Sequence, residues 1–501
     1  MKFKLKGISQ TELSKLNIVS SVLNQLVTIV CGIVIPRVII SVFGSEAYGI
    51  SVSIAQFLSY VALLESGIGG VARAKLYGPL AEKDDARVSA VYFAIRRFFM
   101  LVGGVFAVYS IGLGAVYHDI AGVEIFSRTY VFFLVLTISI STLVKYTGGL
   151  ADLTLINADR KQYVHNFINI IVTAANAVLV VILAKVGLGL IWVKLGSSLL
   201  FIVKPILYAI YVKKHYRLKR DPKRKVVLEQ KWTGVGQHIA YFIHMNTDVV
   251  LLTLLADIKT VAVYSIYSLV ISSIRGITES FAGGMEARFG ELIATGRVED
   301  LRSSHGRYRR LLSAASFVLF SCAGILIVPF VRIYTAGVSD ANYIQPAFAF
   351  VLLMAETFNC ISFTYPQLAV AANRFKQTRW GAYGEALINI GVSLALISKT
   401  PLVGVAIGTL AATVFRGIFY AVYASRNILG IGTGSVLAHM AAVPVLMTAV
   451  IVPGARFVEG LEIGDLFHWF ICAFCVFAAT ASAAGAYLLI HRKLSGRRQV
   501  G

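Results

Sequence analysis

Long apolar blocks separated by short polar clusters run along the whole chain. Leu, Ile, Val, Phe and Ala dominate blocks of roughly 20 residues, and a helix of that length crosses about 30 Å of hydrocarbon. The pattern therefore predicts about fourteen transmembrane helices. They lie near 17–41, 49–71, 90–117, 129–150, 164–184, 187–211, 236–255, 261–285, 311–333, 344–372, 381–398, 402–424, 435–454 and 466–490.

Composition supports the bilayer as the solvent of this chain. Of its 501 residues 57% are hydrophobic and only 14% are charged, which is more apolar surface than one soluble core can hide. The fold class we predict is an all-α, polytopic integral membrane protein. It would consist of two six-helix bundles around a central cavity, followed by a C-terminal helix pair.

One long polar stretch divides the two predicted bundles. HYRLKRDPKRKVVLEQKWTGVGQH, at 215–238, has the charge density of a soluble linker. We therefore predict an N-terminal lobe at 1–214, a basic cytosolic linker at 215–235 and a C-terminal lobe at 236–430. The extra helix pair and a basic cytosolic tail occupy 431–501.

Short motifs recur in the same order in both predicted lobes. ESGIGG at 65–70 is matched by ESFAGG at 279–284, a tyrosine precedes each (Tyr48 and Tyr264), and an Asp-x-Arg triplet follows each. This order indicates an internal duplication. Because each copy contains an even number of helices, the repeat is parallel, with its axis along the membrane normal. We interpret the glycines as helix-packing positions.

The formal charge of +22 follows from membrane topology. Lys and Arg concentrate in the N-terminal arm and near 73–97, 160–161, 213–231 and 288–310, whereas the loops between carry about one each. Basic loops face the cytosol, so an even helix count places both termini there. We predict an uncleaved N-terminal arm, because the apolar run behind it is too long for a signal peptide. No nucleic-acid partner is needed to explain the charge.

Signatures of catalysis were sought and not found. The chain contains no G-x-x-x-x-G-K-[ST], H-E-x-x-H or G-x-S-x-G motif, and its predicted outer loops are short for a membrane glycosyltransferase. We expect no enzyme activity, metal or cofactor, and leave coupling to H⁺ or Na⁺ open. Lys83-Asp84-Asp85 is interpreted as a solvated loop. All five cysteines fall in apolar spans and are interpreted as small hydrophobic side chains.

Charged residues inside the predicted spans are the candidates for function. Burying them in lipid would cost several kcal/mol, so they should face protein or water. Unpaired cations distributed over both lobes would attract phosphate or another anionic group. The candidate cavity cations are Lys145, Lys194, Lys204, Arg275, Arg416 and Arg37, and the candidate cavity or coupling acids are Asp248, Glu356, Glu65 and Glu279.

Structural roles compete with these functional ones. An intramembrane charge can serve only to lock two helices in an ion pair, and Arg37, close to the outer surface, can extend to the interface. Arg275 lies four residues before Glu279 and can pair with it on one helix face. His244 and Asp248 are four residues apart and share a helix face. This spacing is expected for a proton-coupled pair and equally for a buried hydrogen bond that only satisfies both side chains.

Several stretches carry a family resemblance that covers most of 15–425. SVFGSEAYGISVSIAQFLSYVALLESGIGGVARAKLYGPLAEKD, the segment at 156–216 and NTDVVLLTLLADIKTVAVYSIYSLV are similar to polysaccharide and oligosaccharidyl-lipid flippases. These belong to the multidrug/oligosaccharidyl-lipid/polysaccharide exporter superfamily. The resemblance implies a V-shaped pair of bundles in a bacterial-type plasma membrane. Of the charged residues, it extends to Asp248 alone, and the last helix pair would form a lipid groove or pad the lobe.

The resemblance also implies a function. A polyprenyl-diphosphate-linked glycan would be carried from the inner to the outer leaflet by alternating access. The partners would be that lipid-linked glycan, membrane lipids and other polysaccharide-assembly membrane proteins. One alternative is a multidrug exporter whose cationic cargo meets carboxylates such as Asp248 and Glu356. A second alternative is a scaffold without transport activity, in which buried charges serve only helix packing.

Overall fold

The structure is a computed structural model that describes residues 10–65, 69–221, 235–280, 285–461 and 463–497. The chain divides into two compact units, Met1–Val235 and Gly236–Gly501. Throughout the described residues every regular element is a helix. The predicted all-α class is therefore confirmed, whereas the glycines at 66–68 and 281–284 lie outside the described part of the chain.

Unit 1 contains long helices with local interruptions. The span from Arg128 to Ala158 passes through a π-helical turn, and the span from Leu190 to His215 is broken at Ile202. Its elements are α1 (Gln10–Ser59), α2 (Ala62–Glu65), α3 (Gly69–Ala81), α4 (Asp85–Ala121), α5 (Arg128–Val144), the π-helix η1 (Lys145–Gly149), α6 (Leu150–Ala158), α7 (Gln162–Lys185), α8 (Leu190–Phe201) and α9 (Val203–His215).

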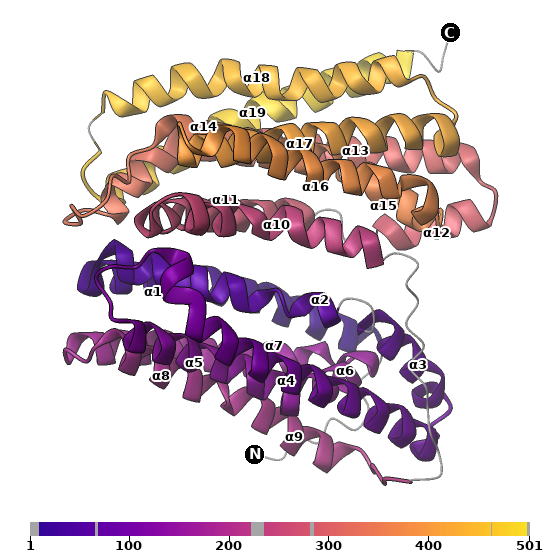
Figure 1. The fold of residues 1–501 in the computed structure, drawn as a ribbon. Coiled ribbons are helices and arrows are strands. Elements are labelled where there is room, and N and C mark those ends of the chain that lie inside the picture. The colour runs from indigo at the N-terminus through magenta and orange to yellow at the C-terminus, as the bar shows by residue number, and fades with distance from the viewer. Residues whose placement is uncertain (1–9, 66–68, 222–234, 281–284, 462, 498–501) are drawn as a thin grey trace. The chain divides into compact units, whose positions relative to one another are not determined.

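Unit 2 repeats this plan and adds two helices, and its long helices run side by side (Figure 1). Its elements are α10 (Val235–Leu255), α11 (Ile258–Ser280), α12 (Met285–Ala294), α13 (Val298–Tyr334), α14 (Pro346–Ser362), α15 (Thr364–Ala371), α16 (Phe375–Ile397), α17 (Pro401–Ala424), the π-helix η2 (Ser425–Leu429), α18 (Thr433–Glu459) and α19 (Leu466–Arg497).

The described residues contain 12 helices long and apolar enough to cross a membrane. The first of them covers two predicted spans, because α1 is interrupted at Gly44, where φ is 85° and ψ is 171°. The predicted span at 236–255 falls in α10, whose apolar described part, Asn246–Leu255, is shorter than a full span. In the described residues, each predicted span thus falls on one or more helices, and fourteen stands as an approximate count.

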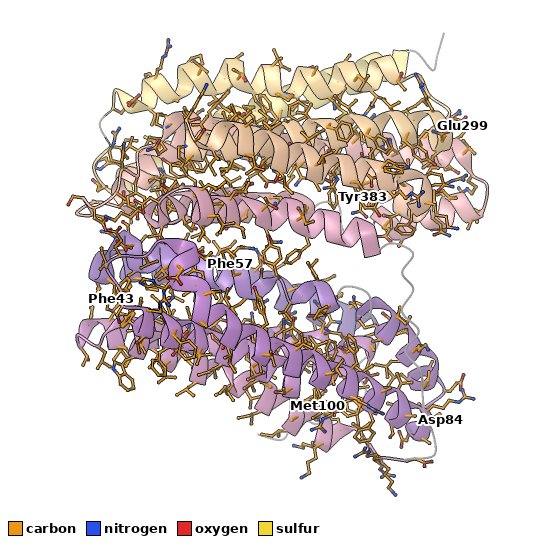
Figure 2. All side chains as sticks on the ribbon, in the orientation of Figure 1. Phe43, Phe57, Asp84, Met100, Glu299 and Tyr383 are labelled. Carbon is orange, nitrogen blue, oxygen red and sulfur yellow. The ribbon has the colours of Figure 1, made fainter. Side chains whose placement is uncertain are left out.

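Large apolar side chains cover the outside of both units. Met100 of α4 is 54% exposed (Figure 2), and Phe470 and Phe474 of α19 are 63% and 73% exposed. In water such a surface would be unfavourable, whereas lipid tails cover it without cost. The chain is a multi-pass membrane protein.

Asp84, which the sequence placed in a solvated loop, caps a helix. Its Oδ1 accepts hydrogen bonds from the backbone N–H groups of Ala86 and Arg87, at 3.1 and 2.9 Å. These are two of the donors left free at the start of α4. Among the described residues no group of three or more His, Cys, Asp or Glu could hold a metal ion.

Polar side chains join α1 to α7 in unit 1. Asn17 Oδ1 accepts from the N–H of Tyr163 at 2.8 Å, and Asn166 Nδ2 donates to Ser20 Oγ at 2.9 Å. Further along, Asn169 Nδ2 donates to Asn24 Oδ1 at 2.7 Å. Hydrogen bonds of this kind hold helices together where lipid supplies no hydrophobic driving force. They fix the face of α7 that carries Asn169.

In unit 2, α16 and α17 pack backbone against backbone. A Cβ added at Gly408 would overlap Ser393 Oγ and lie 2.8 Å from the carbonyl oxygen of Asn389. Only glycine permits this approach. It brings Asn389 of α16 next to Thr409 of α17, two residues that belong to the candidate site.

Candidate functional site

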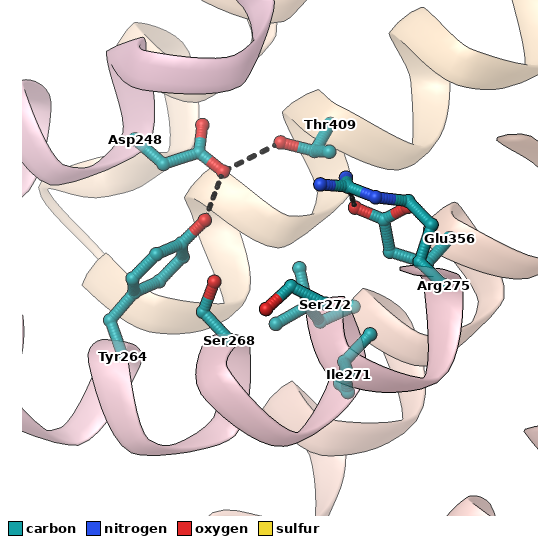
Figure 3. Close-up of a pocket in the computed structure, with 9 residues that line it drawn as sticks. Asp248, Tyr264, Ser268, Ile271, Ser272, Arg275, Glu356 and Thr409 are labelled. Carbon is teal, nitrogen blue, oxygen red and sulfur yellow. Dashed lines mark hydrogen bonds and ion pairs between the residues drawn. The ribbon is translucent and has the colours of Figure 1, made fainter. Parts of the chain in front are cut away.

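Asp248 of α10 is the centre of a buried polar cluster in unit 2. It is 4% exposed, and its Oδ2 accepts hydrogen bonds from Tyr264 Oη of α11 at 2.9 Å and Thr409 Oγ1 of α17 at 2.8 Å (Figure 3). Thr409 in turn accepts from Asn389 Nδ2 at 3.0 Å. Four helices therefore converge on one carboxylate.

Three oxygen atoms in and beside this cluster have no hydrogen-bond partner among the described residues. They are Asp248 Oδ1, Asn389 Oδ1 and Ser393 Oγ, and both Asn389 and Ser393 are fully buried. A buried acceptor without a donor is costly, so such atoms are uncommon in stable proteins. Carboxylate, amide and hydroxyl oxygens are ligands for small hard cations, and the carboxylate also accepts a proton.

A small cavity adjoins Asp248. It has a volume of about 50 Å³ and is lined by Asp248, Tyr264, Ser268, Ile271, Ser272, Arg275, Leu352, Glu356 and Thr409. That is enough for a few water molecules, each of which needs about 10–15 Å³ measured in this way. In Figure 3, Asp248 and the Arg275–Glu356 pair border the same space.

Arg275 is held by carboxylates. Its Nη1 donates to Glu356 Oε1 of α14 at 2.9 Å, and its Nε lies 3.8 Å from Glu279 Oε1 on the same helix. The predicted Arg275–Glu279 pair is therefore present, but the shorter contact is with Glu356. Asn359 Nδ2 also donates to Glu356 Oε2 at 3.1 Å.

Arg416 is likewise paired. Its Nη1 donates to Glu385 Oε1 of α16 at 3.1 Å, and the Glu385 side chain is 1% exposed. The expectation that Arg275 and Arg416 are unpaired cations is wrong, because neighbouring helices supply a carboxylate to each. With Asp248 and Glu279 included, four carboxylates in this region accompany two guanidinium groups.

The lysines of unit 1 have a different environment. Lys204 Nζ of α9 donates to Asn169 Oδ1 at 2.6 Å and to Thr173 Oγ1 at 3.5 Å, and lies 4.3 Å from the centre of the Phe201 ring. Lys145 Nζ lies 5.6 Å from the centre of the Tyr146 ring. Neither they nor Lys194 of α8 form an ion pair with any residue that the structure describes. The contacts of Lys204 and Lys145 there are thus with neutral groups.

The remaining candidates do not join one site. Glu65 Oε2, at the end of α2, accepts from Tyr146 Oη of η1 at 3.3 Å, and Arg37 is half-buried within α1. The side chain of His244 lies outside the described residues, so its pairing with Asp248 stays a prediction.

Sequence reasoning missed the neutral partners. Tyr264 and Thr409 bond to Asp248, Asn389 bonds to Thr409 and Ser393 lies beside Gly408, yet none of the four was singled out for this role. One signal was available: Glu385, Asn389 and Ser393 follow one another at intervals of four residues and therefore share one face of α16. Polar side chains on one face of a membrane span indicate a protein-facing or ion-binding surface.

Comparison with known proteins places the fold. No protein-family model matches the sequence, and no curated protein matches it. Among solved structures, the lipid II flippase MurJ in an inward closed conformation has a TM-score of 0.65 at 14% identity, covering 95% of this chain and 99% of that chain. The MATE multidrug transporter DinF-BH has a TM-score of 0.60 at 16% identity, covering 86% and 100%.

A third similar structure is an inward-facing multidrug resistance MATE family transporter of the MOP superfamily. Its TM-score is 0.54 at 13% identity, over 82% of this chain and 98% of that chain. The chain thus has the fold that these transporters share. At such identities the likeness establishes the fold alone, so substrate and direction have to be argued from the residues.

Proposed function

We propose, from the fold shared with a lipid II flippase and multidrug transporters, that this chain is a transporter of polyprenyl-diphosphate-linked oligosaccharide. It would move this precursor of a surface polysaccharide from the cytosolic to the outer leaflet by alternating access. We place it in a bacterial-type plasma membrane with both termini in the cytosol. Membrane proteins that assemble the polysaccharide would supply and consume the cargo.

The observation that carries this proposal is the environment of the unit 1 lysines. Lys204 is hydrogen-bonded to an amide and a hydroxyl, so its positive charge is solvated but not neutralised. An anionic group that approaches Lys204, Lys194 or Lys145 gains an interaction that no described carboxylate already satisfies. A diphosphate linked to a sugar and a lipid is an anion of this kind.

Unit 2 would supply the coupling ion. Asp248 Oδ1, Asn389 Oδ1 and Ser393 Oγ are buried oxygens without hydrogen-bond partners among the described residues. A proton or Na⁺ bound at Asp248 would compensate the free Oδ1 of that carboxylate. Because carboxylates outnumber guanidinium groups in this region, uptake of a cation lowers the net charge buried in unit 2. We therefore infer that unit 1 contacts the anionic cargo and unit 2 binds H⁺ or Na⁺.

The same carboxylates support a second candidate function. A multidrug exporter carries cationic compounds, and Asp248, Glu279 and Glu356 would attract such a cargo directly. The unit 1 lysines would then repel it. Efflux of a cationic dye by the overproduced chain, abolished by Asp248→Asn, would favour this alternative.

The experiment that tests the proposal is deletion of the gene followed by a leaflet-resolved assay of lipid-linked glycan. The proposal expects the glycan to accumulate on the cytosolic leaflet and the wild-type chain to relieve the accumulation. A deletion strain that still presents its glycan on the outer leaflet would contradict it. Dye efflux is measured in the same strains. A multidrug exporter would change dye efflux, whereas a scaffold would change neither dye efflux nor the leaflet distribution of the glycan.

A further inference from the structure

A second pocket lies between α12 and α13 and shares no lining residue with the cavity at Asp248. Its volume is about 410 Å³, within the roughly 300–1,000 Å³ of small-ligand sites. Four of its lining residues, spaced by three and four, share one face of α13. The lining consists of Arg288, Ser304, Arg307, Tyr308 and Leu311.

The acidic side chains at this end of unit 2 are largely engaged. Their ion pairs are Arg288–Glu291, Arg297–Asp300 and Arg302–Glu299, at 2.9, 2.7 and 2.6 Å. Arg307, by contrast, is exposed and has no carboxylate within ion-pair distance among the described residues. The pocket thus offers one guanidinium group without an acidic partner and a second, on Arg288, that shares Glu291.

The pocket also spans the point at which α13 changes from polar to apolar. Residues 298–310 contain most of the charge of this helix, and the run from Leu311 to Val331 contains no charged residue. Leu311 itself is 43% exposed. A ligand in this pocket would therefore meet guanidinium and hydroxyl groups at one end and an exposed apolar side chain at the other.

We propose that this pocket binds a phosphate group carried by a lipid in the leaflet predicted to be cytosolic. Guanidinium groups bind phosphate oxygens in pairs of parallel hydrogen bonds, and the hydroxyls of Ser304 and Tyr308 are further donors. The exposed side chain of Leu311 favours a lipid over inorganic phosphate, because an acyl or prenyl chain can pack against Leu311 and a free phosphate ion cannot. Either a bilayer phospholipid or a polyprenyl diphosphate provides this chemistry, and the site is inferred independently of the transport proposal.

The test is a lipid titration of the full-length protein in detergent, followed by native mass spectrometry. The probes are dioleoylphosphatidylglycerol, dioleoylphosphatidylcholine, undecaprenyl diphosphate and inorganic phosphate. We expect Arg307→Gln to weaken binding of phosphatidylglycerol, undecaprenyl diphosphate or both about fivefold, the value of one cation near a lipid surface. Arg307→Lys keeps the charge but loses the paired hydrogen bonds, so its lipid affinity should lie between those of the wild type and Arg307→Gln.

Arg297→Gln is the charge-matched control, because it changes the net charge equally at the N-cap of α13 but outside the pocket lining. Its affinity is expected to equal that of the wild type. A loss as large as that of Arg307→Gln would overturn the site, because binding would then follow overall surface charge. Displacement of the lipids by equimolar inorganic phosphate would overturn the lipid assignment. If Arg307→Gln weakens the binding of only one of the two anionic lipids, that lipid is the ligand of the pocket.

Discussion

Lys204 and Arg416 lie on the sixth helix of their respective six-helix halves, and each contacts the helix before it. Arg416 meets the carboxylate of Glu385, whereas Lys204 meets the amide of Asn169. The Arg416–Glu385 pair is therefore neutral overall, because its partner is a carboxylate. The Lys204–Asn169 pair keeps a net positive charge, because its partner is an amide. The two units are thus chemically unequal at corresponding places.

The Arg416–Glu385 pair makes a prediction about stability. Glu385→Gln should lower the free energy of unfolding by about 3–5 kcal/mol, because it removes the carboxylate that forms a largely buried ion pair with Arg416. The check is denaturation of the purified protein in detergent. The double variant Glu385→Gln/Arg416→Gln should recover part of the loss. If the two single effects simply add in the double variant, the pair has no coupling energy and this account of it is wrong.

Asp248 makes a prediction about coupling. Asp248→Asn keeps the shape of the side chain but removes its negative charge and its ability to take up a proton. In proteoliposomes we expect the variant to transport at the same slow rate with and without an imposed Na⁺ or pH gradient. Asp257→Asn, at an exposed position just after α10, is the control and should respond like the wild type. A gradient response preserved in Asp248→Asn would exclude Asp248 as the coupling site.

The sequence identified which charges lie inside the spans but not which of them pair. Apolar periodicity reports the length of a span and its protein-facing residues, whereas an ion pair depends on how two helices meet. Arg275 and Glu356 are 81 residues apart, and Thr409 is 161 residues from Asp248. The i,i+4 pair of Arg275 with Glu279 could be predicted because both residues belong to one helix.

At the scale of elements, close contact of α16 and α17 holds Asn389 and Thr409 together. Gly408→Val should destabilise the protein by about 1–3 kcal/mol, because the added side chain overlaps Ser393 and the backbone of Asn389. Thermal melting in detergent measures this. Gly391→Ala on α16, where a Cβ meets nothing within 4 Å, is the control. A Gly408→Val variant as stable as the wild type would refute the close approach.

The elements themselves could be predicted because hydrocarbon thickness sets their length. The interruption of α1 at Gly44 fits the sequence, which already separated two spans there. The π-helical turn at Lys145–Gly149 could not be predicted. It inserts one residue into a continuous apolar span, and such a local change in helix geometry leaves the hydrophobic pattern intact.

At the scale of the whole molecule, the two units differ in charge. Among the described residues, unit 1 has lysines without a carboxylate partner and unit 2 has more carboxylates than guanidinium groups around Asp248. A flippase of anionic lipid-linked cargo that is driven by a cation needs both. The fold alone is compatible with anionic or cationic cargo, since a lipid II flippase and multidrug transporters share it. The positive charge on Lys204 is therefore the feature that favours an anionic cargo over a cationic one.

The most direct test is rescue of the gene deletion with Lys204→Gln at matched abundance, measured as lipid-linked glycan on the cytosolic leaflet. Lys185→Gln, which removes an exposed charge at the end of α7, is the control. We predict that the wild type and Lys185→Gln relieve the accumulation and that Lys204→Gln does not. Full relief by Lys204→Gln would contradict the proposal that the unit 1 lysines contact the anionic cargo.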